Sequence, residues 1–425
     1  MDMNRRSFLV SSAAAVGALA LPSVRARAAS SLQLSVSHGE PTYVDMLNAL
    51  GTAFHADHQD VQAKFVADGD NWDPLLQNTL RESIVGALPD ITWQSLTYAP
   101  ILAKRGIAQP LNEVAGGAGA VESLGISRAL IDTTAVGGKV FALPFGTTIP
   151  VVYYNMDLLR RAGYRKSTLP TTWDELIETG KRVAGLGGHV NGGYIEYSAT
   201  NAWMFQNLLS SFGGRMMNPA QTQITFDGKE GLEALQILSR FAQVNNVDMT
   251  TDQSRQSFNA GVSGIQIRSA SGISSAAKAA AGRFELQVGE FPLSSPGGRL
   301  VGAGHGFFMF AKDPRRQKAS WELIRFAAQT KGQAILAQYT GYLPVNLLSL
   351  NDPEFLRQYF QANPYHKSII KSLAVTGDQF SFPTANNVKI AQMMSEEMRK
   401  VITGSRKPNE ALAAMATQTR AMLTS

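Results

Sequence analysis

Residues 143–176 limit the possible folds of this chain more than any other segment. They begin with an extended segment, 143–150, that contains two prolines, and continue with an apolar run, 151–155, that indicates a buried strand. A short helical pattern then stops at Gly163, and a second one begins at the threonine pair 171–172, which provides a favourable helix cap. A chain with this order of elements is expected to leave one domain and enter another.

The rest of the chain favours an α/β fold. A length of 425 residues already suggests more than one domain. Strands are predicted at 32–36, 63–67 and 88–93, separated by a helix at 44–58 and another from Pro74. This alternation is typical of sheets flanked by helices, in which ligands bind beyond the carboxyl ends of parallel strands. We therefore expect mixed, mainly parallel sheets with helices on their faces.

Two further crossings are predicted later in the chain. After a loop at 294–299, the glycine-rich apolar segment 302–310 is expected to return to the first domain, and residues 340–346 to cross once more. Three extended crossings would make a hinge between two lobes. The predicted lobes are residues 29–146 with 302–342, and residues 147–300 with 343–425.

The first 28 residues have the pattern of an export signal rather than of a domain. The arginine pair 5–6 begins a twin-arginine pattern, and an apolar stretch follows at 11–21. That stretch is too short to span the ~30 Å hydrocarbon core of a bilayer as a helix. We expect export to the periplasm, with cleavage near Ala28.

Charge and cysteine content exclude several classes of function. The formal charge of +6 falls to +3 when the four arginines and one aspartate of the leader are removed, which leaves little support for a nucleic-acid partner. The chain has no cysteine, which excludes thiol nucleophiles, zinc ribbons, iron–sulfur clusters and a lipid-modified N-terminal cysteine. His55 and His58 flank an aspartate, but on an exposed helix they fit a solvated face better than a metal site. We expect a monomer without metal or cofactor.

Two motifs could suggest an enzyme, and neither is specific. The glycine-rich segment 302–306 has Phe307 where the dinucleotide fingerprint requires its last glycine, and no Walker lysine follows. Close approach of backbone amides to a small ligand and simple tight packing both explain it. Ser263 lacks the spacing of a nucleophile elbow. A pair of glycosidase carboxylates cannot be recognised in a sequence, so an exported carbohydrate-active enzyme remains the alternative.

Aromatic residues at the ends of predicted elements give the strongest chemical indication. Trp72, Tyr197, Trp203 and Tyr342 all have this position. A sugar or polyol can lay its C–H face on such a ring while its hydroxyls bond to nearby polar groups. Core packing explains each ring singly, whereas the set favours binding. We expect Trp72 and Tyr342 to lie in loops, where loss of the ring would cost little stability.

Several segments together resemble the extracellular solute-binding proteins of ABC importers, within the maltose-binding-like class and closest in pattern to its glycerol-3-phosphate-binding members. The matching segments are 144–155, 170–176, 258–261, 269–272, 302–308, 340–344, 403–404 and 408–412. The resemblance implies a two-lobed, type II periplasmic-binding-protein fold. It also implies a receptor that closes around one small ligand and delivers it to inner-membrane permease subunits served by a cytoplasmic ATPase.

The resemblance implies binding residues from both lobes, namely His38, Trp72, Thr147, Trp203 or Tyr197, Ser271, Gly304 and Tyr342. Ser95 or Gln94 stands where the resemblance implies an acidic residue. We expect both of these and His305 of the glycine-rich segment to line the site as well. One departure concerns the ligand, because the glycerol-phosphate receptors use an arginine near the C-terminus and residues 381–387 contain none here. A guanidinium is the usual partner of a phosphate dianion. We expect a sugar, polyol or glycosyl-glycerol, or a glycerol-phosphate-like ligand with a weaker anionic group. A sensor subunit that presents ligand to a membrane receptor is a third hypothesis.

Overall fold

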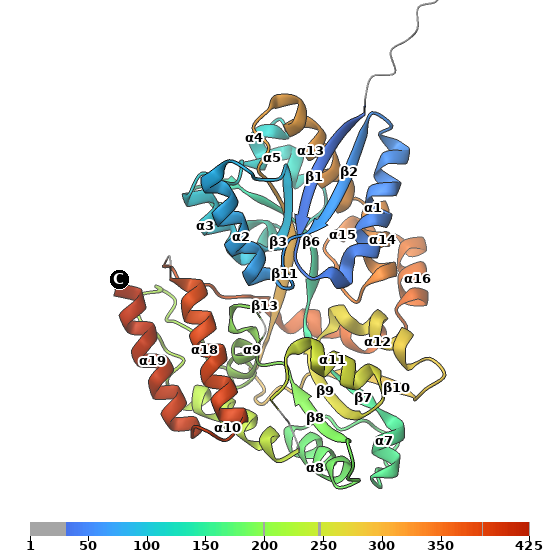
Figure 1. The fold of residues 1–425 in the computed structure, drawn as a ribbon, viewed down its shortest axis with the longest axis vertical. Coiled ribbons are helices and arrows are strands. Elements are labelled where there is room, and N and C mark those ends of the chain that lie inside the picture. The colour runs from blue at the N-terminus through green and yellow to red at the C-terminus, as the bar shows by residue number, and fades with distance from the viewer. Residues whose placement is uncertain (1–30, 199, 245–247, 385, 425) are drawn as a thin grey trace, which may run out of the picture.

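The computed structural model describes residues 31–198, 200–244, 248–384 and 386–424, so the predicted leader lies outside the described residues. Figure 1 shows two lobes, each built on a sheet with helices against its faces. Strand β1 (Leu32–His38) lies in the sheet of the first lobe and β7 (Pro150–Asn155) in that of the second. The predicted two-lobed α/β fold is confirmed.

The first lobe contains a sheet with the strand order β12-β6-β11-β3-β1-β2 and β13 beside β11. Its remaining strands are β2 (Val61–Ala67), β3 (Ile91–Ser95), β6 (Ala142–Thr148), β11 (Leu300–Met309), β12 (Leu343–Pro344) and β13 (Thr376–Asp378). Its helices are α1 (Val44–Asp57), α2 (Trp72–Val85), α3 (Ala99–Lys104), α4 (Leu111–Val114), α5 (Ala118–Glu122), α6 (Arg128–Asp132), α13 (Pro314–Ala328) and α14 (Thr330–Tyr339). A short hairpin joins β4 (Ala135–Val136) to β5 (Lys139–Val140).

The second lobe contains a four-stranded sheet with the order β10-β7-β9-β8. Its other strands are β8 (Asn191–Ile195), β9 (Ser263–Ser269) and β10 (Leu286–Glu290). The helices that follow β7 in the chain are α7 (Met156–Arg161), α8 (Trp173–Ala184), α9 (Trp203–Ser211), α10 (Lys229–Phe241), α11 (Thr251–Asn259) and α12 (Ile273–Ala280). The C-terminal region adds α15 (Leu347–Leu350), α16 (Pro353–Ala362), α17 (His366–Ile369), α18 (Asn387–Ile402) and α19 (Pro408–Thr424).

Both sheets are mixed, as predicted, but parallel pairs do not dominate them. β1 runs parallel to β2 and β3, whereas β11 runs antiparallel to β3 and β6, and β7 runs antiparallel to β9 and β10. A strand that arrives from the other lobe enters its sheet from the opposite end. β11, which returns from the second lobe, is therefore antiparallel to β3 and β6, which precede the crossing into that lobe.

The predicted stop and cap signals act where the sequence places them. Thr172 is the N-cap of α8, and its hydroxyl accepts a hydrogen bond of 3.2 Å from the backbone N–H of Glu175. Gly163 follows α7 with φ of +86°, a left-handed conformation that glycine adopts without strain. These local signals explain why the chain forms two helices directly after entering the second lobe.

The crossings lie close to one another in the middle of the molecule (Figure 1). β6 passes into β7 at Ile149, and β10 leads to β11 through residues 291–299. β12 still pairs with β6, so residues 343–344 lie in the sheet of the first lobe, and Thr147 and Thr148 do as well. β13 adds a further strand beside the start of β11. The boundaries between the lobes stay a prediction. Strand pairing adds residues 147–148, 300–301, 343–344 and 376–378 to the sheet of the first lobe.

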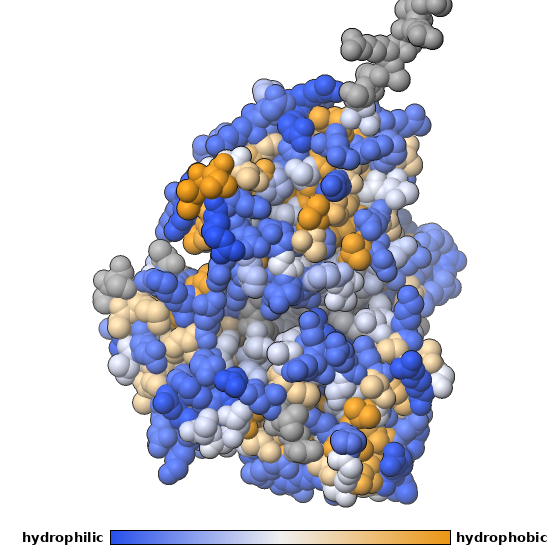
Figure 2. Space-filling model, viewed as in Figure 1, coloured by the Kyte–Doolittle hydropathy of each residue, from blue (hydrophilic) through white to orange (hydrophobic). Residues whose placement is uncertain are grey.

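The surface is mainly polar. Figure 2 shows hydrophilic residues over most of one face and a recess where the lobes meet. Ile84 and Val85, at the end of α2, are the most exposed of the large apolar side chains, at 81% and 75%. Within the part of the chain that the structure describes, no helix combines the length and apolar character needed to cross a bilayer.

Candidate ligand-binding site

A cavity of about 250 Å³ lies between the lobes, and we call it the interlobe cavity. Residues from both lobes and from the crossing strands line it, namely Glu40, Asp70, Asn71, Trp72, Ser95, Thr148, Glu196, Ser198, Trp203, Thr250, Thr251, Asp252, Arg255, Ser269, Ser271, Ala303, His305, Tyr342 and Gln379. Two tryptophans, four carboxylates and one guanidinium belong to this lining. The cavity therefore combines flat apolar surfaces with charged and hydroxyl groups, as sites for small polar ligands do.

Trp72 and His305 form an aromatic wall on the side of the first lobe. Their rings stack at a centroid distance of 4.1 Å and an angle of 27°, and Trp93 packs edge-on against Trp72 at 5.0 Å. Asn71 places the indole, because its side chain accepts a hydrogen bond from the backbone N–H of Trp72 and caps α2. Trp72 is thus the first residue of a helix and not a loop residue, and it is 3% exposed.

His305 is neutral in this wall. Burial lowers its pKa to about 3, well below the ordinary value of 6.5. Its Nδ1 lies 3.0 Å from the hydroxyl of Tyr342, whose pKa burial raises well above 10. Both side chains are uncharged at neutral pH. The histidine therefore provides hydrogen-bonding capacity and a flat ring, but no positive charge.

Trp203 presents a second indole from the other lobe. Its Nε1–H donates a 2.7 Å hydrogen bond to the carbonyl oxygen of Val301 on β11, which fixes the plane of the ring. The preceding residues, Asn201 and Ala202, have φ of 58° and 50°, in the left-handed region that non-glycine residues rarely adopt. Strain of this kind persists only where surrounding contacts hold it, and it is common at binding sites.

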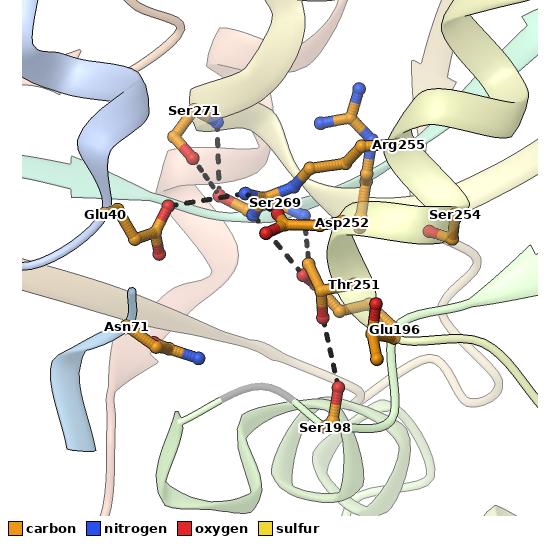
Figure 3. A network of polar contacts seen from close by, with 12 residues as sticks. Glu40, Asn71, Glu196, Ser198, Thr251, Asp252, Ser254, Arg255, Ser269 and Ser271 are labelled. Carbon is orange, nitrogen blue, oxygen red and sulfur yellow. Dashed lines mark hydrogen bonds and ion pairs between the residues drawn. The ribbon is translucent and has the colours of Figure 1, made fainter. Parts of the chain in front are cut away.

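Arg255, on α11, lies at the centre of a cluster of carboxylates (Figure 3). Its guanidinium nitrogens are 3.4 Å from Glu40, 3.6 Å from Glu196 and 3.7 Å from Asp252. Burial raises the pKa of Glu40, and the charge of Arg255 opposes that shift. Burial disfavours the charged form of Arg255, but the carboxylates outweigh it and raise its pKa. Arg255 is therefore a permanent cation between two buried carboxyl groups.

The charged cluster joins the two lobes, because Glu40 follows β1 while Arg255 and Glu196 belong to the second lobe. A hydrogen bond also joins the lobes, because the hydroxyl of Tyr43 donates to Oγ of Ser271 at 3.0 Å. The site is consequently assembled only where the lobes meet.

Hydroxyl groups line the floor of the cavity where the chain crosses. Oγ of Ser269 is 2.7 Å from Oγ of Ser271 and 2.8 Å from Oγ1 of Thr148. The backbone N–H of Ser271 donates to Oγ1 of Thr148 at 3.1 Å. Arg268 lies beneath this floor, almost fully buried, with its guanidinium 4.0 Å from the ring centre of Tyr153.

Six residues predicted from the sequence lie together in this lining, namely Trp72, Ser95, Trp203, Ser271, His305 and Tyr342. The other five lie outside it. Thr147 and Gly304 line a neighbouring cavity instead, because successive residues of a strand face opposite sides.

Three of the five have identifiable partners elsewhere. Nδ1 of His38 is 2.9 Å from the carbonyl oxygen of Gly39, and the residue is fully buried. The amide of Gln94 donates to the hydroxyls of Thr79 and Thr92. The hydroxyl of Tyr197 donates to Asp248 at 2.9 Å. These side chains support the sheets and loops that carry the site.

Thirteen of the nineteen lining residues were not predicted, and four of them show why: Glu40, Thr148, Glu196 and Arg255. Glu40 belongs to the exit loop of the first predicted strand, which was a usable signal, and Glu196 directly precedes the predicted Tyr197. Thr148 is the neighbour of the predicted Thr147 on the same strand. Adjacent side chains face opposite sides of a strand, and the side that faces the interlobe cavity carries Thr148. Arg255 is inside a helix without a distinguishing pattern, and only the tertiary structure brings it to the cavity.

Comparison with known proteins agrees with this architecture. The family model for bacterial extracellular solute-binding proteins matches residues 49–365. The sn-glycerol-3-phosphate-binding periplasmic protein UgpB of Pectobacterium atrosepticum is 23% identical over 441 residues, which cover 99% of this chain and 97% of that protein. Among solved structures, UgpB from Mycobacterium tuberculosis in complex with glycerophosphocholine has a TM-score of 0.80 at 18% identity, covering 93% of this chain and 98% of its own.

A second similar structure is maltose-bound MalE3 of T. maritima, with a TM-score of 0.77 at 19% identity over 92% of this chain and all of that one. The two structural likenesses concern the fold. The resemblance predicted from the sequence is confirmed, and with it the prediction of a binding protein rather than an enzyme. The chain belongs to the bacterial extracellular solute-binding protein family, whose members are exported receptors for small solutes.

Proposed function

We propose that this protein is the periplasmic receptor of an ABC importer and that it captures a neutral polyhydroxylated ligand, such as a sugar, a polyol or a glycosyl-glycerol. The observation that carries the proposal is the composition of the interlobe cavity, where indole rings from both lobes stand beside carboxylates and hydroxyls. Aromatic faces pack against the C–H face of a sugar, and carboxylates and serine hydroxyls bond to its hydroxyl groups.

The charge of the lining favours a neutral ligand over a phosphate ester. Four carboxylates face the cavity, with Arg255 as their counter-ion and Arg268 beneath the floor, and His305 is neutral. A phosphate dianion would meet an excess of negative charge, which opposes binding. The UgpB relatives are named for glycerol 3-phosphate, and we expect this chain to differ from them. Glycerol 3-phosphate should bind at least about tenfold more weakly than a neutral glycoside of similar size.

Isothermal titration calorimetry of the mature protein tests the proposal with a panel of neutral sugars and polyols, glycosyl-glycerols, glycerol 3-phosphate and glycerophosphocholine. We expect stoichiometric binding of a neutral member and its recovery intact by mass spectrometry. Tightest binding of glycerol 3-phosphate would contradict the neutral-ligand proposal while leaving the receptor role in place. Turnover of a bound sugar would instead favour the carbohydrate-active enzyme.

We also propose the finer points of localisation and partnership. The twin-arginine pattern supports export of a folded chain and cleavage near Ala28, and the importer's permease subunits would receive the ligand. A single cavity assembled from two lobes of one chain is complete without a second copy, which supports a monomer. Mass spectrometry of the exported protein locates the cleavage, and light scattering measures the oligomeric state.

A further inference from the structure

A second cavity of about 230 Å³ lies beside the interlobe cavity and is not part of the site described above. The residues that matter for its character are Thr97, Thr133, Thr147, Gly302, Gly304 and Gln379. Helices of the first lobe form one side of it. The other side is the segment after β13, which is attached to the second lobe because the carbonyl oxygen of Phe380 accepts hydrogen bonds from Asn201 and Gln206.

The two cavities lie on opposite faces of the ribbon formed by β6 and β11, which we call the hinge ribbon. Ala303 and His305 face the interlobe cavity, whereas Gly302 and Gly304 face the second one. On the partner strand, Thr148 faces the first cavity and Thr147 the second. The alternation of side chains along a strand explains this division.

The cavities adjoin at one edge of the hinge ribbon. Gln379 lines both of them. Ser95 lines the first and Thr97 the second, and their hydroxyl oxygens are 2.9 Å apart. The boundary between the two cavities therefore carries two hydroxyls from the first lobe and the amide of Gln379. A hydroxylated ligand that extends from the interlobe cavity toward the second cavity would therefore meet polar side chains at the boundary.

The chemistry of the second cavity differs from that of the first. None of the described residues that line it carries a charge, and half of them have hydroxyl or amide side chains. Three more are glycines, which lets a ligand approach the backbone closely. Such a lining suits a neutral, hydroxylated group and provides no counter-charge for a phosphate or an ammonium.

We propose that the second cavity is a subsite for a second neutral, hydroxylated unit of the ligand, so that the natural ligand has at least two units, for example a disaccharide or a glycosyl-glycerol. This inference rests on the proposed function. The first unit occupies the interlobe cavity between Trp72 and Trp203, and the second extends past Gln379 to the threonines on the other face of the hinge ribbon.

Calorimetry with matched probes tests the subsite: glucose against maltose, galactose against lactose, and glycerol against glucosylglycerol. The wild-type protein should bind at least one two-unit probe about tenfold or more tightly than its one-unit partner. Thr133→Leu places extra bulk in the second cavity and should remove most of that gain while leaving the one-unit affinity unchanged. Thr133→Val has nearly the shape of threonine and should retain most of the gain.

Gly302→Ala provides a second, independent variant. An added Cβ would lie 3.0 Å from Cγ2 of Thr376 and 3.4 Å from Oγ1 of Thr147, which narrows the cavity from its strand side. It too should weaken two-unit probes selectively, with melting temperatures checked for both variants. Equal weakening of both probe classes, or a wild-type protein that prefers one-unit probes, would overturn the subsite and leave the proposed function standing. Binding of no probe by the wild type would overturn both.

Discussion

Arg255 is the residue on which the electrostatics of the interlobe cavity depend. Its side chain is 22% exposed, and those of Glu40 and Glu196 are 12% and 6% exposed. Arg255→Met should leave the two carboxylates buried without their counter-ion. We expect a loss of unfolding free energy of about 1–3 kcal/mol. The double variant Arg255→Met/Glu40→Gln should recover part of it, because an unpaired buried charge costs more than a missing pair.

Urea unfolding of the single and double variants measures this coupling. Arg128→Met is a matched control, because Arg128 and Glu122 form an ion pair whose side chains are 70% and 50% exposed. Exposed pairs contribute at most about 1 kcal/mol. A loss for Arg255→Met no larger than that of the control, or no recovery in the double variant, would mean that the cluster is as well solvated as a surface pair.

His305 gives the site a pH dependence of known sign. Its folded pKa of about 3 is below the ordinary value of 6.5. As the pH falls below 6.5, the unfolded chain binds a proton on this histidine that the folded chain does not, so unfolding becomes more favourable. The loss of stability should grow by about 1.4 kcal/mol per pH unit until the pH nears the folded pKa.

The comparison with His305→Asn isolates this effect. His38 and His366, whose pKa values burial also lowers, contribute equally to both proteins and cancel in the difference. Urea unfolding at pH 7 and pH 5 should show a larger loss of stability in the wild type than in the variant. Identical pH dependences in the two proteins would show that the imidazole is hydrated in the folded state.

Two aromatic residues show why sequence position alone did not settle their roles. Trp72 and Tyr342 do line the cavity, but they are 3% and 1% exposed and pack in one aromatic cluster with Tyr43 and Trp93. This burial argues against the expectation that either ring could be removed with little loss of stability. Truncation of a buried ring to Ala costs about 3–5 kcal/mol. A conservative change such as Trp72→Phe keeps a ring in the aromatic cluster, so its effect on ligand affinity can be measured in a folded protein.

At the scale of elements, the sequence predicted best where a local signal acts alone. The crossing at 143–155, the cap at Thr172 and the stop at Gly163 depend on proline, threonine and glycine chemistry and appear as expected. The direction of a side chain on a crossing strand depends on register, which local sequence does not fix. This is why Thr147 was predicted and Thr148 faces the interlobe cavity. Arg255 depends on how α11 packs, which no local pattern encodes.

At the scale of the whole molecule, the two lobes are joined by covalent crossings and by contacts that form only when they meet. The connections between the sheets, at Ile149 and at residues 291–299, can absorb rotation while each sheet stays rigid. The contacts across the cavity include the pair between Glu40 and Arg255 and the hydrogen bond from Tyr43 to Ser271. A closed state is therefore stabilised by the protein itself as well as by any ligand that touches both lobes.

This arrangement predicts a population shift. A ligand gains its second set of contacts only in the closed state, and that difference in affinity moves the equilibrium. The variant Tyr43→Phe/Glu40→Gln removes these two contacts and should populate the open state more than the wild type does. Small-angle scattering without ligand should give the variant a larger radius of gyration. Saturation with a sugar verified by calorimetry should bring both proteins to the same smaller value.

Arg128→Met serves as the control and should match the wild type throughout. If saturation leaves every radius unchanged although the unliganded variant is more open, the lobes do not close on the ligand and delivery by the closed form is excluded.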